Sequence, residues 1–189
     1  MSSEEMQALW SRVLAGQVRK PGTTSIRTLG ILKDVDVTTA RLFSRFCSAA
    51  VYLMGHEGDI FDARVPSLGG NAGQNSIAEF DLGFGQLNRL NEHGLIISDY
   101  DSYNTYVVVS EPDRDRELEL YHQGVPWDWV LAEQNVKERT VKLHGVAMTV
   151  AGSELSRVVT PQPIAEYTKA LSPSLTACFE VGCLSAGCR

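Results

Sequence analysis

Hydrophobic residues near the N-terminus recur at the spacing of an α-helix. Ser2 and Glu5 have the spacing of a capping box, in which each side chain satisfies a free backbone N–H at the helix start. Gly16 supplies a typical helix stop. The pattern therefore predicts an amphipathic helix ending near residue 16. Its apolar face consists of Met6, Leu9, Trp10, Val13 and Leu14.

Two more helices are expected in the next forty residues. Ser25 can cap a short helix that carries Ile26, Leu29, Ile31 and Leu32. A longer helix is expected to start after Asp36 or Thr38, and its apolar residues are nearly continuous, which predicts burial on most sides. These residues are Ala40, Leu42, Phe43, Phe46, Cys47, Ala50, Val51 and Leu53.

The pattern changes between residues 55 and 76. Residues 56–59 are typical of a turn, residues 60–65 of a strand, and residues 66–73 of a glycine-rich loop. We expect a loop-rich connection here, which is either a hinge or a disordered stretch.

The segment that follows predicts a helix and a β-hairpin. Residues 84–93 form a helical pattern with Gly94 at its C′ position, and residues 95–97 are an apolar strand. The polar stretch 99–104 and the β-branched run 105–109 then predict a hairpin with residues 95–97. This order is typical of a winged helix, with residues 85–93 in the position of the recognition helix.

The last third of the chain mixes strands and helices. Strands are expected at 117–121 and 139–148, and helices after the Thr149 cap and around 164–171. The predicted fold class is α+β, with N-terminal helices, a winged-helix-like helix/β-hairpin unit and a mixed strand/helix C-terminal region. We expect one domain over residues 1–175, comprising a helical region (1–54), a winged-helix-like region (77–110) and a strand/helix region (116–175), and a cysteine-containing tail at 176–189.

Charge narrows the possible partners. The 189 residues contain 17 Lys and Arg against 23 Asp and Glu, a formal charge of −6, so no general attraction to phosphate backbones is expected. The N-terminus is acidic and no apolar run approaches the length of a membrane span. We therefore expect a cytoplasmic protein without a membrane partner, whose four cysteines are reduced thiols.

Two stretches resemble an uncharacterised bacterial domain-of-unknown-function family, often found in mobile or phage-related regions. Residues 9–32 match its pattern LW-x3-LAG-x4-PG-x2-S-x-RTL-x2-L, and residues 148–155 are similar to its LT-x-AG-x-EL element. The pattern is also similar to that of the abortive-infection alpha family. The resemblance implies a role in bacterial conflict but no chemistry. Members usually carry a region before this motif, so we expect a fragment, an internal start or a stand-alone relative.

Four basic residues form the densest cationic cluster: Arg12, Arg19, Lys20 and Arg27. Convergent cations can bind phosphate or an acidic partner. The alternative is that Arg27 hydrogen-bonds to neighbouring helix ends, and the acidic balance of the chain favours this structural interpretation.

The expected recognition helix carries Asn88 and Arg89, which are residue types that read base edges. However, the expected wing carries Asp99 and Asp101, which would repel phosphates. We therefore favour protein contact over DNA contact for this unit.

Other chemistry-bearing residues have ordinary explanations. Trp127 and Trp129 fall on one side of an extended segment, as core residues or as an aromatic contact for a partner. Cys178, Cys183 and Cys188 could bind zinc only if His122 or His144 joined them, and their spacing favours incidental tail thiols instead. We expect no metal, no cofactor and no catalytic residue.

Two functions remain open, and an enzyme of unknown type is a distant third. The favoured hypothesis is a non-enzymatic protein-interaction module in bacterial or phage conflict. It would be a defence component or an anti-CRISPR-like inhibitor that presents carboxylates to a nucleic-acid-binding complex. The alternative is a winged-helix transcription regulator that binds DNA through residues 85–93, as a dimer.

Overall fold

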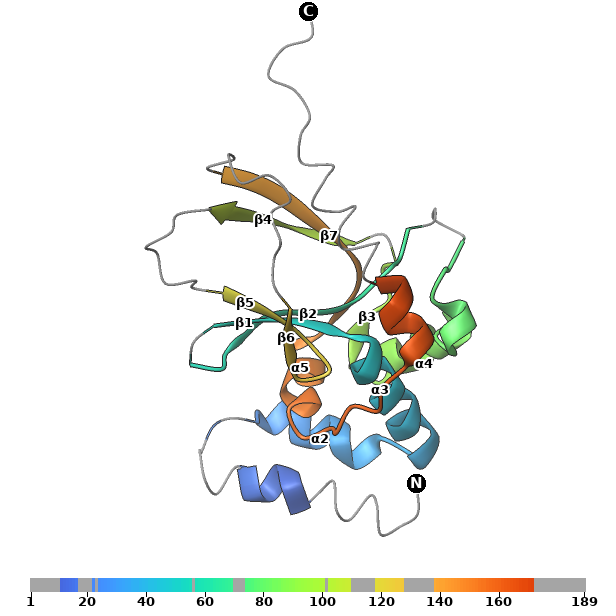
Figure 1. Ribbon diagram of the computed structural model, residues 1–189. Helices are drawn as coiled ribbons and strands as arrows, with labels where there is room; N and C mark the ends of the chain where they lie inside the picture. Colours follow the sequence, from blue (N-terminus) through green and yellow to red (C-terminus); the bar gives the residue numbers. More distant parts are fainter. Residues whose placement is uncertain are drawn as a thin grey trace, which may run out of the picture.

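The computed structural model describes residues 11–16, 22, 24–55, 57–69, 74–100, 102–109, 118–127 and 138–171. Its helices lie together on one side of an antiparallel sheet, and a two-stranded ribbon extends beyond the sheet on the other side (Figure 1). The structure confirms the α+β fold class.

The helices begin where local capping residues place them. Ser25, Asp36 and Thr149 each accept a hydrogen bond from the backbone N–H three residues later. The four labelled α-helices are α2 (Ile26–Asp34), α3 (Val37–Ala49), α4 (Phe84–Glu92) and α5 (Val150–Ser156). Residues 11–16 and 165–171 are also helical, and η1 (Ala78–Phe80) is a 3-10 turn.

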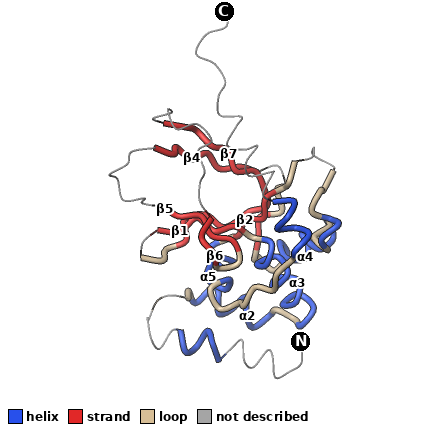
Figure 2. The backbone as a smooth tube through the Cα atoms, viewed as in Figure 1, coloured by secondary structure: helices blue, strands red, loops and turns tan. Residues whose placement is uncertain are grey.

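Seven antiparallel strands make up the sheet (Figure 2). They are β1 (Val51–Gly55), β2 (Ile60–Pro66), β3 (Ile96–Ile97), β4 (Tyr103–Val109), β5 (Leu118–His122), β6 (Val125–Trp127) and β7 (Glu138–Met148). The strand order is β3-β7-β2-β1-β5-β6, and β4 pairs separately with β7.

Strand β7 belongs both to the two-stranded ribbon and to the main sheet. Its first segment, residues 138–144, pairs with β4 as a ribbon, and its last segment pairs with β2 and β3. Gly145 stands at the change of partner, where an added Cβ would lie 2.2 Å from the carbonyl oxygen of Val65. A glycine is therefore required for β7 to approach β2 at this point.

A buried ion pair lies where β7 separates from β2. The Arg64 side chain, 3% exposed, bonds both carboxylate oxygens of Asp62, at 2.6 and 3.0 Å. Arg64 also donates to the carbonyl of Leu143 at 2.8 Å, and the Tyr106 hydroxyl donates to Asp62. The network therefore connects β2 to both strands of the ribbon.

The core lies between the helices and the sheet. Phe46 of α3, Val65 of β2 and Leu90 of α4 are completely buried in it. Tyr167 is also buried and donates a hydrogen bond to the carbonyl of Pro66, which fixes helix 165–171 against the end of β2. The helix expected around 164–171 is thus confirmed.

The predicted end of the third helix is wrong. α3 ends at Ala49, Ala50 has an extended backbone, and Val51 and Leu53 belong to β1 instead of a helix. These two residues are buried and alternate with the more exposed Tyr52, which is the two-residue period of a strand. The region expected to be helical, residues 1–54, therefore contains most of the strand β1.

The predicted hairpin of residues 95–109 is also wrong. β3 and β4 do not pair with each other in the described residues but lie in line along the same side of β7. Ser102 joins them, because its backbone and side chain both bond Gly145. The helix at 84–93 with its Gly94 stop is confirmed, whereas the winged-helix arrangement is not.

Candidate binding groove

Two of the four residues of the predicted basic cluster lie in the described part of the structure. Arg12 donates to the Thr160 hydroxyl at 3.2 Å, and Arg27 is exposed on α2. Arg19 and Lys20 lie outside the described residues. Of the expected helix face, Val13 is buried but Leu14 is exposed.

Arg89 is held by the neighbouring helix. Its guanidinium donates to the Asp36 carboxylate at 2.7 Å and to the Thr39 hydroxyl at 2.8 Å. The Thr39 backbone N–H and then Arg89 lower the pKa of Asp36 to about 2. Arg89 therefore joins α4 to the start of α3, while Asn88 is exposed.

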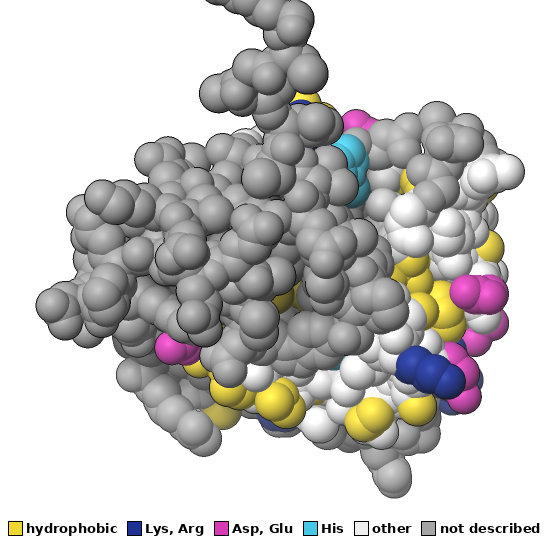
Figure 3. Space-filling model, turned by 45° about the horizontal axis from the view of Figure 1, so that its top comes forward, with side chains coloured by type: hydrophobic (Ala, Val, Ile, Leu, Met, Phe, Trp, Pro, Cys, Tyr) yellow, Lys and Arg dark blue, Asp and Glu magenta, His cyan; other side chains and the backbone are white. Residues whose placement is uncertain are grey.

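The structure describes two of the other predicted contact residues. Asp99 is exposed, Trp127 lies on β6, and Asp101 and Trp129 fall outside the described residues. Figure 3 shows a mixture of charges on one face, where the basic side chains at the lower right lie against acidic ones.

Of the residues considered as zinc ligands, the structure describes the two histidines. His122 is buried and contacts the carbonyl of Ala50 and the hydroxyl of Thr168 through its two ring nitrogens. His144 is exposed beside Tyr103, and the three tail cysteines lie outside the described residues. Cys47 is buried, which raises its thiol pKa to about 12.

The two sequence stretches that carry the family resemblance contact each other. Glu154 of α5 accepts a hydrogen bond of 2.8 Å from the backbone N–H of Ser25, at the start of α2. Thr149 caps α5 and also donates to the carbonyl of Gly94 at 2.6 Å. These motif residues hold helix ends in place, so the role that the structure gives them is to stabilise the fold.

One edge of β2 is left open by the path of β7. The β2–β7 pairing stops at Arg64 opposite Ala147, because the chain turns into α5 after Met148. From residue 60 to 63, β2 pairs only with β1 among the described strands. Alternate residues of a strand direct their N–H and C=O groups to opposite neighbours, so part of this backbone faces away from β1.

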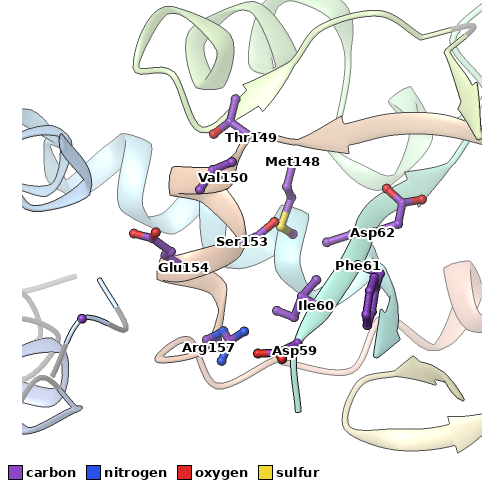
Figure 4. A pocket seen from close by; sticks show the side chains of 12 residues that line it. Asp59, Ile60, Phe61, Asp62, Met148, Thr149, Val150, Ser153, Glu154 and Arg157 are labelled. Atoms are coloured by element: carbon purple, nitrogen blue, oxygen red, sulfur yellow. The ribbon is translucent and has the colours of Figure 1, made fainter. Parts of the chain in front are cut away.

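The open edge faces α5 across a cavity of about 460 Å³. Figure 4 shows β2 on one side and α5 on the other, with Thr149 at one end and Asp59 and Arg157 at the other. We call this cavity the β2–α5 groove. Its lining comprises Gly22, residues 59–63, residues 148–150, Ser153, Glu154 and Arg157.

The groove combines apolar contacts with hydrogen-bonding backbone. Phe61 is 66% exposed and Val150 is 76% exposed, so two hydrophobic side chains of the lining are accessible to solvent. Phe61 is an extra residue in β2, because Leu53 pairs with Asp62 while Met54 pairs with Ile60. The groove therefore offers both main-chain and side-chain contacts to an extended segment.

Sequence reasoning missed this groove. The strand at 60–65 and the Thr149 cap were both predicted, and together they supply both walls. The missing information was the register of β2 with β7, because that register decides which residues of β2 lack a neighbour.

The fold and the groove define an α+β protein with an open sheet edge beside a helix. A family model described as "Protein of unknown function (DUF2806)" matches residues 1–172, so the chain belongs to this family. No curated protein and no solved structure gives a significant match. Within the described ranges, none of the helices has the length and apolar character needed to cross a membrane.

Proposed function

We propose that this chain is a protein-interaction module that binds an extended segment of a partner protein by adding a strand to the open edge of β2. The main observation behind this proposal is the β2–α5 groove, in which residues 60–63 have no neighbour among the described strands on the side facing α5. Strand addition satisfies the free backbone groups and lets alternate side chains of the partner enter the groove.

The surroundings of the edge suit a single segment better than a whole sheet. α5 stands opposite the edge, and the extra residue at Phe61 interrupts the regular pairing of β2. Both features are known devices that prevent two sheets from joining edge to edge. A single extended segment of about four residues spans the open length of roughly 13 Å.

We further propose that the chain acts in the cytoplasm as a non-enzymatic component of bacterial or phage conflict, in defence or as an inhibitor of a nucleic-acid-binding complex. This setting is supported only by the resemblance to families found in mobile regions. Phage plaque counts on cells with and without the gene would test it. Equal counts for a broad phage panel would contradict a defence role.

The alternative, a DNA-binding regulator that reads bases through α4, has less support. Arg89 is the basic residue of that helix, and its guanidinium is bonded to Asp36 and Thr39. An arginine occupied in this way is not available to a guanine edge.

Peptide titration followed by NMR tests the groove directly. The probe is a capped five-residue peptide in which valine and threonine alternate. The control is the same peptide with methylated backbone nitrogens. We expect the first to shift the amide signals of residues 59–63 and of α5, and the second to leave them unchanged because methylation removes the pairing donors. Shifts spread evenly over the surface would contradict the proposal.

A blocking variant provides the matched protein control. Ser153→Phe places a ring in the groove, whereas Ser98→Phe makes the same change at an exposed position outside the groove lining. We expect S153F to weaken peptide binding by about tenfold or more, a loss of about 1.4 kcal/mol, and S98F to bind like the wild type. Thermal unfolding of both variants checks that they remain folded.

A further inference from the structure

The register of the sheet gives a direction to the segment that we propose to bind. β7 runs antiparallel to β2 and leaves it just after Ala147 reaches Arg64. A partner strand that continues the line of β7 is therefore antiparallel to β2, the better paired of the two directions. Such a strand begins opposite Asp62, beside Thr149, and ends opposite Asp59.

The far end of the groove is negatively charged. Asp59 is exposed there, and Glu57 is exposed two residues earlier in the same turn. Arg157 supplies one positive charge at that end, so the formal sum over these three described residues is −1. The carboxyl end of α5, with its partial negative charge, also lies there.

The other carboxylates of the lining are already occupied. Asp62 is paired through both oxygens with Arg64, and Glu154 keeps its charge but points away from β2 while it accepts the backbone N–H of Ser25 (Figure 4). Among the described residues, the charge on the β2 side of the groove is therefore concentrated at the Asp59 end.

We propose that the partner segment runs antiparallel to β2 and carries lysine or arginine directly after its apolar stretch, next to Asp59 and Glu57. This inference rests on the proposed function, since it specifies the occupant of the same groove. Charges of this kind select partners and orientation at a rim more than they add affinity.

Three capped peptides test direction and charge together. Each contains five alternating valines and threonines, followed by two lysines, preceded by two lysines, or followed by two glutamates. We expect the peptide whose two lysines follow the apolar stretch to bind most tightly. Its affinity should exceed that of the other two peptides by about threefold to tenfold in NMR titrations at low salt. The preference should shrink at about 0.5 M salt because exposed charges are screened.

Charge reversal of the protein supplies the second arm. In the double variant Glu57→Lys and Asp59→Lys, we expect the peptide ending in glutamates to become the tightest. Asp34→Lys, a reversal at the exposed end of α2, should leave the wild-type order unchanged.

The outcomes separate this inference from the proposed function. If all three peptides shift the signals of residues 59–63 with equal affinity, the charge assignment is wrong while strand addition stands. If the peptide with leading lysines binds most tightly, the assigned direction is wrong. If no peptide shifts those signals, the proposed function fails and this inference fails with it.

Discussion

Gly152 of α5 lies so close to Leu95 that a Cβ atom at position 152 would be 2.0 Å from the Leu95 carbonyl oxygen. Leu95 directly precedes β3, and the same carbonyl accepts the backbone N–H of Thr149. The first turn of α5 is thereby fixed against the backbone that leads into β3. The position of α5, and with it one wall of the β2–α5 groove, depends on this close approach.

We expect Gly152→Ala to destabilise the fold by about 3 kcal/mol, because the atom it meets is backbone and cannot rotate away. Gly85→Ala in α4 is the matched control, since an added Cβ there meets nothing within 4 Å. That change should be neutral or stabilise by up to about 1 kcal/mol, as alanine favours a helix. Urea unfolding measures both, and equal stabilities of the two variants would contradict the close packing at Gly152.

The bond between Glu154 and Ser25 should contribute measurably to stability. Glu154→Ala leaves the backbone N–H of Ser25, the N-cap residue of α2, without its acceptor. We expect the free energy of unfolding to fall by about 1 kcal/mol. Glu154→Gln keeps an oxygen at that position, so its loss should be smaller. Glu166→Ala, at an exposed position of helix 165–171, is the reference in the same urea titration.

The sequence predicted those elements of the fold that depend on neighbouring residues. Ser25 and Thr149 cap helices because each bonds an N–H three residues away, and Gly94 ends α4 with a positive φ of 69°. Such signals can be read in a short window of the chain. The placement of α2, α4 and α5 was therefore correct.

Strand pairings between residues far apart in the sequence could not be predicted from such local signals. Residues 51–53 are apolar, and only their register with residues 120–122 of β5 shows that they form a strand. β3 and β4 were assigned to each other because they are close in sequence, whereas their partner β7 lies some forty residues further on. The groove exists because the pairing of β7 with β2 stops at Arg64, which is also a contact between distant residues, so the groove could not be predicted locally.

Removing Arg64 alone should destabilise the fold more than changing Arg64 and Asp62 together. Arg64→Met leaves the nearly buried Asp62 carboxylate without its cation, and we expect a loss of about 3–5 kcal/mol. Adding Asp62→Asn removes the stranded charge and should recover some of that loss. Urea unfolding of the two single variants and the double variant gives the coupling, and strictly additive losses would argue against the pair.

His122 joins three segments of the fold as a neutral side chain. It is 2% exposed, with Nδ1 3.0 Å from the carbonyl of Ala50 and Nε2 3.1 Å from the hydroxyl of Thr168. Gln123 also donates to the Thr168 hydroxyl, at 3.3 Å. Since a carbonyl only accepts, Nδ1 carries the proton and Nε2 accepts from Thr168.

Burial lowers the pKa of His122 below its ordinary value of about 6.5, partly offset by the bond to Ala50. Below pH 6.5 the unfolded chain therefore takes up a proton that the folded chain does not. The stabilising contribution is complete above about pH 6.5 and is lost as pH falls through the lowered pKa. We expect the free energy of unfolding to fall as the pH drops below about 6.5, and His122→Gln to reduce that slope. His144→Gln, which changes an exposed histidine of β7, is the reference variant in the same measurement. If H122Q does not fold, NMR titration of the wild-type His122 ring decides the matter, and a midpoint at or above 6.5 would contradict the prediction.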